Sequence, residues 1–248
     1  MSNKKNNQVT LGIKIRSTIT WIVLVGLIPL YNLAGVLLFF LSRKAKHRML
    51  TSWGNVFTFL GKHWCNVDYE VIGIEHLIKE PAILASNHQS TWETMAFNVF
   101  LPQHVWILKR ELIYLPFFGW ALRMVSPIAI NRSDRVASVQ QILSQSKERV
   151  KDGFSIMVFP EGTRVAPGVD QPYKTGVARM ALQLNIPIVP IAHNAGHIMP
   201  RRSFWIYPGK VTIRIGKPIY PSKDDNAESL TEKVKSAITK ELKIMGEV

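Results

Sequence analysis

Residues 87–93 read NHQSTWE, and the spacing of apolar residues changes at this point of the chain. The run before it, 81–85, is short and apolar, which predicts a buried strand. The run after it, from Trp92 to Phe100, places apolar residues at helical spacing, which predicts a helix. We therefore expect a strand, a short turn and a helix, with His88 in the turn and Glu93 in the first helical turn.

This segment offers an imidazole, His88, and a carboxylate, Glu93, five residues apart. On one continuous helix, five residues are separated by about 140° around the axis, so the two side chains would not meet. They can meet if His88 lies in the turn and Glu93 begins the helix. A carboxylate bonded to one ring nitrogen fixes the tautomer and leaves the other nitrogen free as a general base.

The same residues also fit a helix capping box, with Ser90 as the N-cap and Glu93 as the residue that bonds back to it. In that arrangement Glu93 caps the helix without touching His88. Local sequence alone favours the capping box, because a histidine in a turn is usually an ordinary polar surface residue. The rest of the chain has to decide between the two interpretations.

Length and composition bound the possible functions. The chain of 248 residues is long enough to bury a sizeable core in one domain with an appendage. Its net charge of +14 predicts an anionic partner, but no recognisable nucleic-acid motif accompanies the charge, so nucleic acid is not expected. The single Cys65 excludes a disulfide framework, and the scattered histidines show no metal-ligand spacing, so we expect no metal.

The N-terminal part of the chain is hydrophobic. From Ile19 to Leu41 no residue is charged, and about 20 helical residues suffice to cross a bilayer core. Pro29 interrupts this run, and a second, mildly amphipathic stretch follows at 49–60. We expect residues 1–62 to form a membrane-anchoring helical segment, either a single span or a helical hairpin that lies in one leaflet. Basic residues flank the run on both sides, so charge does not decide the orientation.

From residue 63 to residue 248 the pattern is that of an α/β domain. Short β-rich runs alternate with helical patterns, which is typical of a sheet covered by helices on both faces. Pro208-Gly209-Lys210 predicts a hairpin between 205–207 and 211–215. The expected strands are 69–72, 82–86, 105–108, 128–131, 154–159 and 186–191, and the expected helices are 91–101, 112–124, 134–152, 175–184 and a last one from Ala227.

A second polar segment, FPEGTR at 159–164, closes the expected strand 154–159. Pro160 ends the strand and Gly162 allows a tight turn, so Glu161 and Arg164 project from its carboxyl end. Ligands bind at that edge of open α/β sheets. Considered alone, the segment is better explained as an ordinary polar turn with an internal ion pair between Glu161 and Arg164.

Together, the two segments resemble the glycerolipid acyltransferase family, which includes the 1-acylglycerol-3-phosphate (lysophosphatidic acid) acyltransferases. Four blocks match in order and separation, and the resemblance covers about residues 63–220: the blocks are 88–93, 109–132, 159–164 and 188–191. One departure falls in the first block, where the family has Asp and this chain has Glu93. The carboxylate is kept on a stem one methylene longer, so we expect its role to survive with shifted geometry.

The resemblance implies transfer of a fatty acyl group from a thioester to the sn-2 hydroxyl of 1-acylglycerol-3-phosphate, which gives phosphatidic acid. His88 is then the general base and Glu93 its partner. The chain lacks a Gly-x-Ser-x-Gly nucleophile segment, which favours direct attack by the acceptor over an acyl-enzyme. Acyl-coenzyme A or acyl-carrier protein would be a co-substrate, and no cofactor is implied.

The resemblance also implies a phosphate site. Arg164 suits bidentate binding and Lys109 a point-charge contact, with Arg132 as a further candidate. Glu161 either positions the acceptor or braces the turn, and Gly162 serves the backbone geometry.

Three alternatives remain open at this stage. Two are acylation of glycerol-3-phosphate and acylation of a different lysophospholipid. The third is a membrane-anchored protein that binds anionic lipid without catalysis. Because thioester donors are cytosolic, an enzyme of this kind is expected at the cytoplasmic (inner) membrane, with its catalytic domain on the cytoplasmic face.

Overall fold

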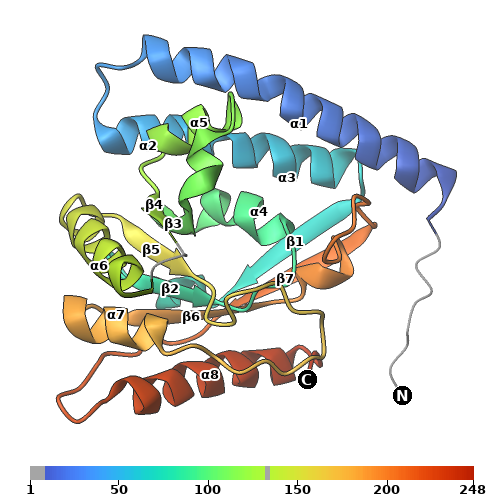
Figure 1. Ribbon diagram of the computed structural model, residues 1–248. Helices are drawn as coiled ribbons and strands as arrows, with labels where there is room; N and C mark the ends of the chain where they lie inside the picture. The colour runs from blue at the N-terminus through green and yellow to red at the C-terminus, as the bar shows by residue number, and fades with distance from the viewer. Residues whose placement is uncertain (1–8, 132–134) are drawn as a thin grey trace.

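The computed structural model describes residues 9–131 and 135–248 (Figure 1). Within these residues a seven-stranded sheet has the order β1-β7-β6-β2-β5-β3-β4. All neighbouring strands are parallel except β6 and β7, which are antiparallel, so the sheet is mixed. The strands are β1 (Val67–Ile72), β2 (Ile83–Ser86), β3 (His104–Lys109), β4 (Ile128–Ile130), β5 (Ser155–Val158), β6 (Ile188–His193) and β7 (Gly209–Ile215).

Helices cover both faces of this sheet, as the alternating pattern predicts (Figure 1). α6, α7 and α8 lie on one face, and α4 lies on the other with α1, α2 and α3 stacked outside it. The helices are α1 (Leu11–Leu37), α2 (Arg43–Thr51), α3 (Trp53–His63), α4 (Trp92–Phe100), α5 (Phe118–Met124), α6 (Arg135–Lys151), α7 (Gly176–Leu184) and α8 (Ala227–Ile244), with short 3-10 helices η1 (Ile74–His76), η2 (Arg110–Tyr114) and η3 (Ala195–His197).

The central strand β2 explains why the sheet is buried on both sides. All four of its residues are buried, and its side chains alternate between two cores. Ile83 and Ala85 pack with residues of α7 and α8, whereas Leu84 packs with residues of α3 and α4. A strand covered on both faces appears in the sequence as a continuous apolar run, and this is the pattern at 81–85.

The predicted helix 112–124 is wrong in one respect, because the segment is broken in the middle. η2 ends at Tyr114, and α5 starts at Phe118. Pro116 explains the break, since it lacks an N–H and forces the residue before it out of the helical conformation. Leu115 is accordingly extended, with φ −65° and ψ 129°, and Phe117 has a positive φ of 59°.

The predicted hairpin around Pro208-Gly209-Lys210 is also wrong. β7 pairs in parallel with β1 and antiparallel with β6, and residues 205–207 form no strand. The backbone N–H groups of residues 206 and 207 bond to other parts of the chain instead. Ile206 N–H donates to Ser17 Oγ of α1 (2.9 Å), and Tyr207 N–H donates to Ile198 O (2.8 Å). Long-range pairing therefore overrides the local turn signal.

α1 is long and apolar enough to be a candidate membrane element, and it is one continuous helix despite Pro29. At 1.5 Å per residue, its 27 residues extend over about 40 Å. α2 and α3 run back beneath it (Figure 1). Trp53 of α3 donates its indole N–H to Leu24 O of α1 (3.2 Å), so the helices of this segment are bonded to each other.

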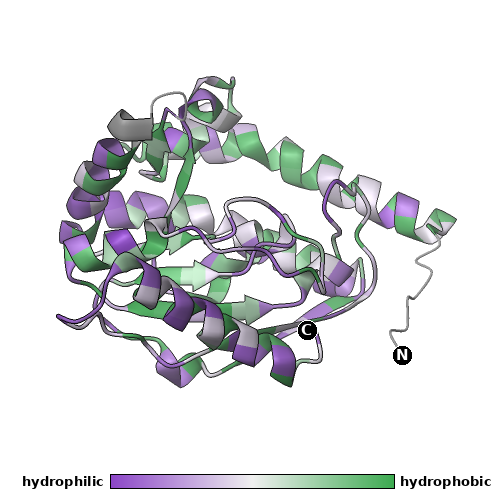
Figure 2. Ribbon diagram, turned by 60° about the horizontal axis from the view of Figure 1, so that its bottom comes forward, coloured by the Kyte–Doolittle hydropathy of each residue, from purple (hydrophilic) through white to green (hydrophobic). Residues whose placement is uncertain are grey.

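The two sides of α1 are arranged in the opposite way to a helix of a soluble protein. Its buried residues, which face the rest of the protein, are mostly small or polar: Ser17, Thr20, Leu24, Asn32 and Gly35. Its large apolar side chains are exposed, and Figure 2 shows hydrophobic colour along most of the helix. The exposed ones include Leu11, Ile15, Ile22, Val25, Leu30, Leu33, Val36 and Leu37.

Candidate active site

The segment 87–93 lies at the carboxyl end of the central strand. β2 ends at Ser86 and α4 begins at Trp92, as the sequence pattern predicts. β5 and β6 flank β2 in parallel, so the residues that follow all three strands meet at one edge of the sheet. This is the edge at which open α/β sheets bind ligands.

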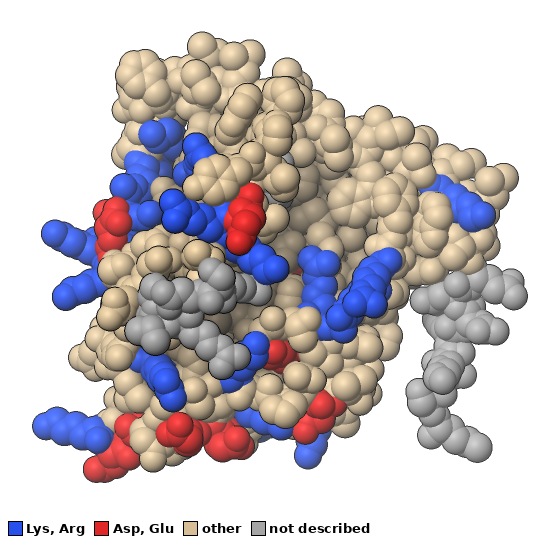
Figure 3. Space-filling model, in the orientation of Figure 1, with Lys and Arg blue, Asp and Glu red and all other residues tan. Residues whose placement is uncertain are grey.

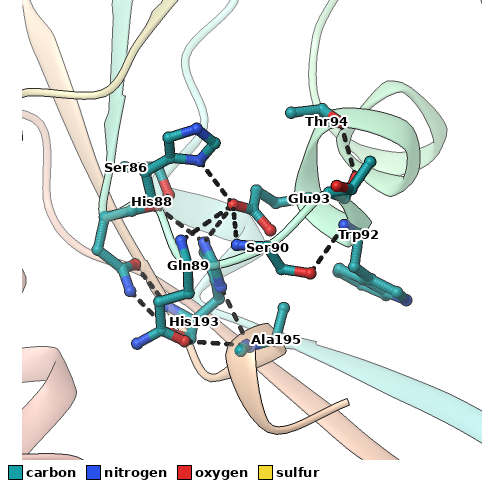
Figure 4. A network of polar contacts seen from close by, with 12 residues as sticks. Ser86, His88, Gln89, Ser90, Trp92, Glu93, Thr94, His193 and Ala195 are labelled. Atoms are coloured by element: carbon teal, nitrogen blue, oxygen red, sulfur yellow. Dashed lines mark hydrogen bonds and ion pairs between the residues drawn. The ribbon is translucent and has the colours of Figure 1, made fainter. Parts of the chain in front are cut away.

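His88 and Glu93 form a bonded pair in this turn (Figure 4). His88 Nδ1 lies 2.8 Å from Glu93 Oε1, with the carboxylate fully buried and the imidazole side chain 14% exposed. A carboxylate accepts hydrogen bonds, so Nδ1 carries the proton and Nε2 keeps its lone pair. Nε2 has no hydrogen-bond partner within residues 9–131 and 135–248. The pair therefore has the geometry of a general base oriented by an acid.

The same carboxylate oxygen also caps the helix. Glu93 Oε1 accepts from Ser90 N–H (2.8 Å) and Gln89 N–H (3.1 Å), while Ser90 Oγ accepts from Trp92 N–H (3.0 Å). The last bond differs from the usual capping box, in which the serine would bond the N–H of residue 93. The two interpretations of the sequence are thus compatible, because one oxygen serves both the cap and the histidine.

Glu93 is an ionised buried carboxylate. Burial on its own raises the pKa of this group, but the hydrogen bond and charge of His88 and the N–H of Ser90 lower it, and the resulting pKa lies below the ordinary value. This negative charge lies beside Nδ1 of His88. The site is therefore suited to stabilise a proton that His88 has accepted.

The second segment, 159–165, holds His88 from three directions. His88 N–H donates to Glu161 Oε2 (2.9 Å), and Val165 N–H donates to His88 O (2.7 Å). The ring of Phe159 stacks on the imidazole, with centroids 3.8 Å apart and planes 10° apart. The sequence pattern alone indicates no role for Phe159. Its place at the end of a strand, directly before Pro160, is the signal that could have revealed it.

Glu161 is buried and touches the backbone of the base. No ion pair joins it to Arg164 in the described parts of the chain, so the internal pair that the sequence allowed is not formed there. Burial raises the pKa of Glu161 to about 8, with a further contribution from the charge of Glu93, against the lowering effect of His88 N–H. Its carboxyl group is thus mostly protonated at neutral pH.

Gly162 has a left-handed backbone, with φ of 70°. A Cβ atom there would lie 2.6 Å from Lys174 Nζ, so a larger residue would displace this lysine as well as strain the turn. The turn around Gly162 thus brings a flexible cation over the segment that holds His88.

The predicted phosphate-binding cations lie at the same edge. Lys109 ends β3, which is two strands from β2, so it starts roughly 10 Å to the side of the base. Arg164 follows β5, the strand between them. Neither side chain has a hydrogen bond or ion pair with another described residue. Arg132 lies outside the described residues.

Comparisons with known proteins agree with this arrangement. A family model described as "Acyltransferase" matches residues 68–194, just over half of the chain, from β1 through β6. A 1-acyl-sn-glycerol-3-phosphate acyltransferase of Pseudomonas aeruginosa is 37% identical over 191 residues, which cover 75% of this chain and 74% of that protein. The chain belongs to the acyltransferase family.

Further relatives of this acyltransferase point the same way. A 1-acyl-sn-glycerol-3-phosphate acyltransferase of Saccharomyces cerevisiae is 30% identical over 205 residues, 79% of this chain and 68% of that protein. The crystal structure of a 1-acyl-sn-glycerophosphate acyltransferase from Thermotoga maritima superposes with a TM-score of 0.77 over 95% of this chain and 98% of that one. At 24% identity, this last match supports the shared fold.

The raised pKa of Glu161 predicts a pH dependence of stability. The folded state holds a proton on this carboxyl up to about pH 8, whereas an unfolded chain releases it near pH 4.5. The contribution of this carboxyl to the free energy of unfolding is therefore fully present below about pH 4.5. It is lost as pH rises towards 8, at up to about 1.4 kcal/mol per pH unit. Glu161→Gln should remove this slope.

Melting temperatures of both proteins between pH 5 and pH 8 test this expectation. Other titrating groups, such as His197, are common to both proteins, so the difference between the two curves isolates Glu161. Parallel curves would show that Glu161 is ionised in the folded protein throughout this range.

Proposed function

We propose that this acyltransferase moves a fatty acyl group from an acyl thioester to the sn-2 hydroxyl of 1-acylglycerol-3-phosphate and so makes phosphatidic acid. The observation that carries the proposal is the His88–Glu93 pair, in which the buried carboxylate holds Nδ1 and leaves Nε2 available. The names of its relatives in Pseudomonas and Saccharomyces support the choice of acceptor.

The reaction needs one proton carrier. His88 Nε2 takes the proton of the acceptor hydroxyl while the hydroxyl oxygen attacks the thioester carbonyl. The tetrahedral intermediate then collapses, the carbon–sulfur bond breaks, and the thiolate leaves and receives the proton from the imidazolium. Glu93 stabilises the imidazolium between these two steps. The base returns to its starting state, so no acyl-enzyme is required.

The acceptor phosphate would bind at the cationic side of the same edge. Arg164 offers a bidentate guanidinium, and Lys109 offers a point charge about two strand spacings from the base. Arg132 remains a third candidate. Because burial raises the pKa of Glu161 to about 8, its carboxyl is mostly uncharged at pH 7 and does not repel a phosphate dianion.

The outer face of α1 would contact the membrane. A helix that turns large apolar residues away from its own domain is stabilised when lipid covers them. α1 is bonded through Ser17, Trp21 and Leu24 to residues 204–206 and to α3, which favours a helical hairpin in one leaflet over a span that projects from the domain.

Charge supports the same placement. On the face in Figure 3, the surface over α1 is almost free of charge except at one end, and Lys and Arg side chains gather below it. Basic residues near the bilayer are attracted to anionic headgroups on the cytoplasmic leaflet. The catalytic domain would then face the cytosol, where coenzyme A and acyl-carrier thioesters are found.

An assay of thiol release tests the proposal. The full chain in detergent is given acyl-coenzyme A or acyl-carrier protein, each with 1-acylglycerol-3-phosphate, glycerol-3-phosphate or another lysophospholipid. We expect release that depends on 1-acylglycerol-3-phosphate, with phosphatidic acid as product. Release only with another acceptor would correct the substrate, and vesicle binding without any release would support the non-catalytic lipid-binding alternative.

Arg164→Ala should raise the acceptor KM by about tenfold or more and change kcat little, because the phosphate contact is the same in the ground and transition states. Lys240→Ala, which removes an exposed cation from α8, controls for the general loss of positive charge. Initial rates over a range of acceptor concentrations give both constants. If the acceptor KM were unchanged in Arg164→Ala, this residue would not bind the phosphate.

A further inference from the structure

A second histidine lies beneath the catalytic turn and has no assigned role. His193 is the last residue of β6 and is fully buried (Figure 4). Its Nε2 lies 2.9 Å from Asn87 O and 3.9 Å from Glu93 Oε1. It therefore lies next to the turn that carries His88 and next to the carboxylate of Glu93.

The hydrogen bonds of His193 fix its charge and its tautomer. A backbone carbonyl can only accept, so Nε2 carries a hydrogen for Asn87 O. Ala195 N–H can only donate, so Nδ1, 3.2 Å away, keeps its lone pair. The ring is therefore neutral, in agreement with the lowering of its pKa by burial.

His193 and Asn87 are joined by three hydrogen bonds between the ends of two strands. Besides the ring contact, His193 N–H donates to Asn87 Oδ1 (2.9 Å) and Asn87 Nδ2 donates to His193 O (2.9 Å). The last two bonds use only the backbone of residue 193, so they survive any substitution there except proline. The ring contact is the one that depends on histidine.

The carbonyl that the ring holds belongs to the peptide between Asn87 and His88. The N–H of that same peptide donates to Glu161 Oε2 (2.9 Å). Its plane is therefore held from both ends, by His193 and the hydroxyl of Ser86 (3.0 Å) at the oxygen and by Glu161 at the nitrogen. A rotation of this peptide would turn the Cα–Cβ bond of His88 and move Nε2 away from the acceptor oxygen.

We infer that His193 is a positioning residue for acyl transfer: its Nε2–H fixes the Asn87–His88 peptide and lies against Glu93, which keeps the His88–Glu93 pair aligned. This inference rests on the proposed function. It does not give His193 a proton to transfer, because its ring is buried and both nitrogens are engaged. A misplacement of about 1 Å at a reacting group can cost about 100-fold in rate.

Two amide substitutions at residue 193 separate the effect of the hydrogen bond at the Nε2 position from the effect of placing any polar side chain there. The side-chain amide of Gln reaches the position of Nε2, whereas that of Asn reaches only the position of Nδ1. His193→Gln should keep kcat within about threefold of wild type, and His193→Asn should lower kcat by about 10- to 100-fold with little change in acceptor KM. Both variants put a polar amide at the same buried site, so a difference in kcat reports the Nε2 contact.

His47→Asn is the matched control for lost stability. His47 is also buried, and its Nε2 also lies 2.9 Å from a backbone carbonyl, that of His104, at the start of β3. This variant should lower the melting temperature as His193→Asn does, while its kcat stays close to that of wild type.

A double-mutant cycle with Glu93→Gln tests whether His193 acts through the pair. Once the pair is broken, alignment no longer matters, so His193→Asn should lower kcat much less in the Glu93→Gln background than in wild type. Equal factors in both backgrounds, or equal kcat values for the Asn and Gln variants, would overturn the inference. Wild-type protein with no acceptor-dependent release would instead refute the proposed function, so the two failures are distinguishable.

Discussion

One oxygen atom organises this protein's candidate active site. Glu93 Oε1 accepts from His88 Nδ1, from Ser90 N–H and from Gln89 N–H, all within 3.1 Å. A buried carboxylate is costly unless its charge is compensated, and these donors compensate it. The start of α4, the shape of the turn and the tautomer of the base are thereby fixed together.

The second oxygen of Glu93 is different, since Oε2 is buried and has no hydrogen-bond partner among the described residues. All three hydrogen bonds of this carboxylate go to Oε1. A buried acceptor without a partner costs about 1–3 kcal/mol. Glu93, the residue that orients the base, therefore costs the folded protein some stability.

Parallel strands bring the supporting residues together. β5, β2 and β6 are neighbours that point the same way, so Phe159, Glu161 and His193 reach a histidine that is over 70 residues away in the sequence from the first two and over 100 from the third. His88 is held through its amide, its carbonyl and its ring face. All three contacts come from segment 159–165, which directly follows the buried strand β5.

The spacing of apolar residues predicted correctly those elements that depend on residues close together in the sequence. The strand–turn–helix at 81–100 and most helices follow from periodicity. The geometry of the turn allowed a His88–Glu93 contact, but local sequence favoured the capping box, and the family resemblance was needed to predict the pair. The hairpin at 205–215 was wrong because β1, β6 and α1 supply the partners of that segment, and the helix 112–124 was wrong because Pro116 breaks it. Phe159 and His193 were missed because their roles exist only once β5 and β6 lie beside β2, and the sequence does not state strand order.

The measurement that tests the account most directly is the kcat of His88→Gln for acceptor-dependent thiol release from the acyl donor, compared with wild type under identical conditions. The backbone contacts of residue 88 do not involve its side chain, so the variant should fold with a similar melting temperature. If Nε2 of His88 removes the acceptor proton, kcat falls by about 100-fold or more. Undiminished release by the folded variant would contradict the account.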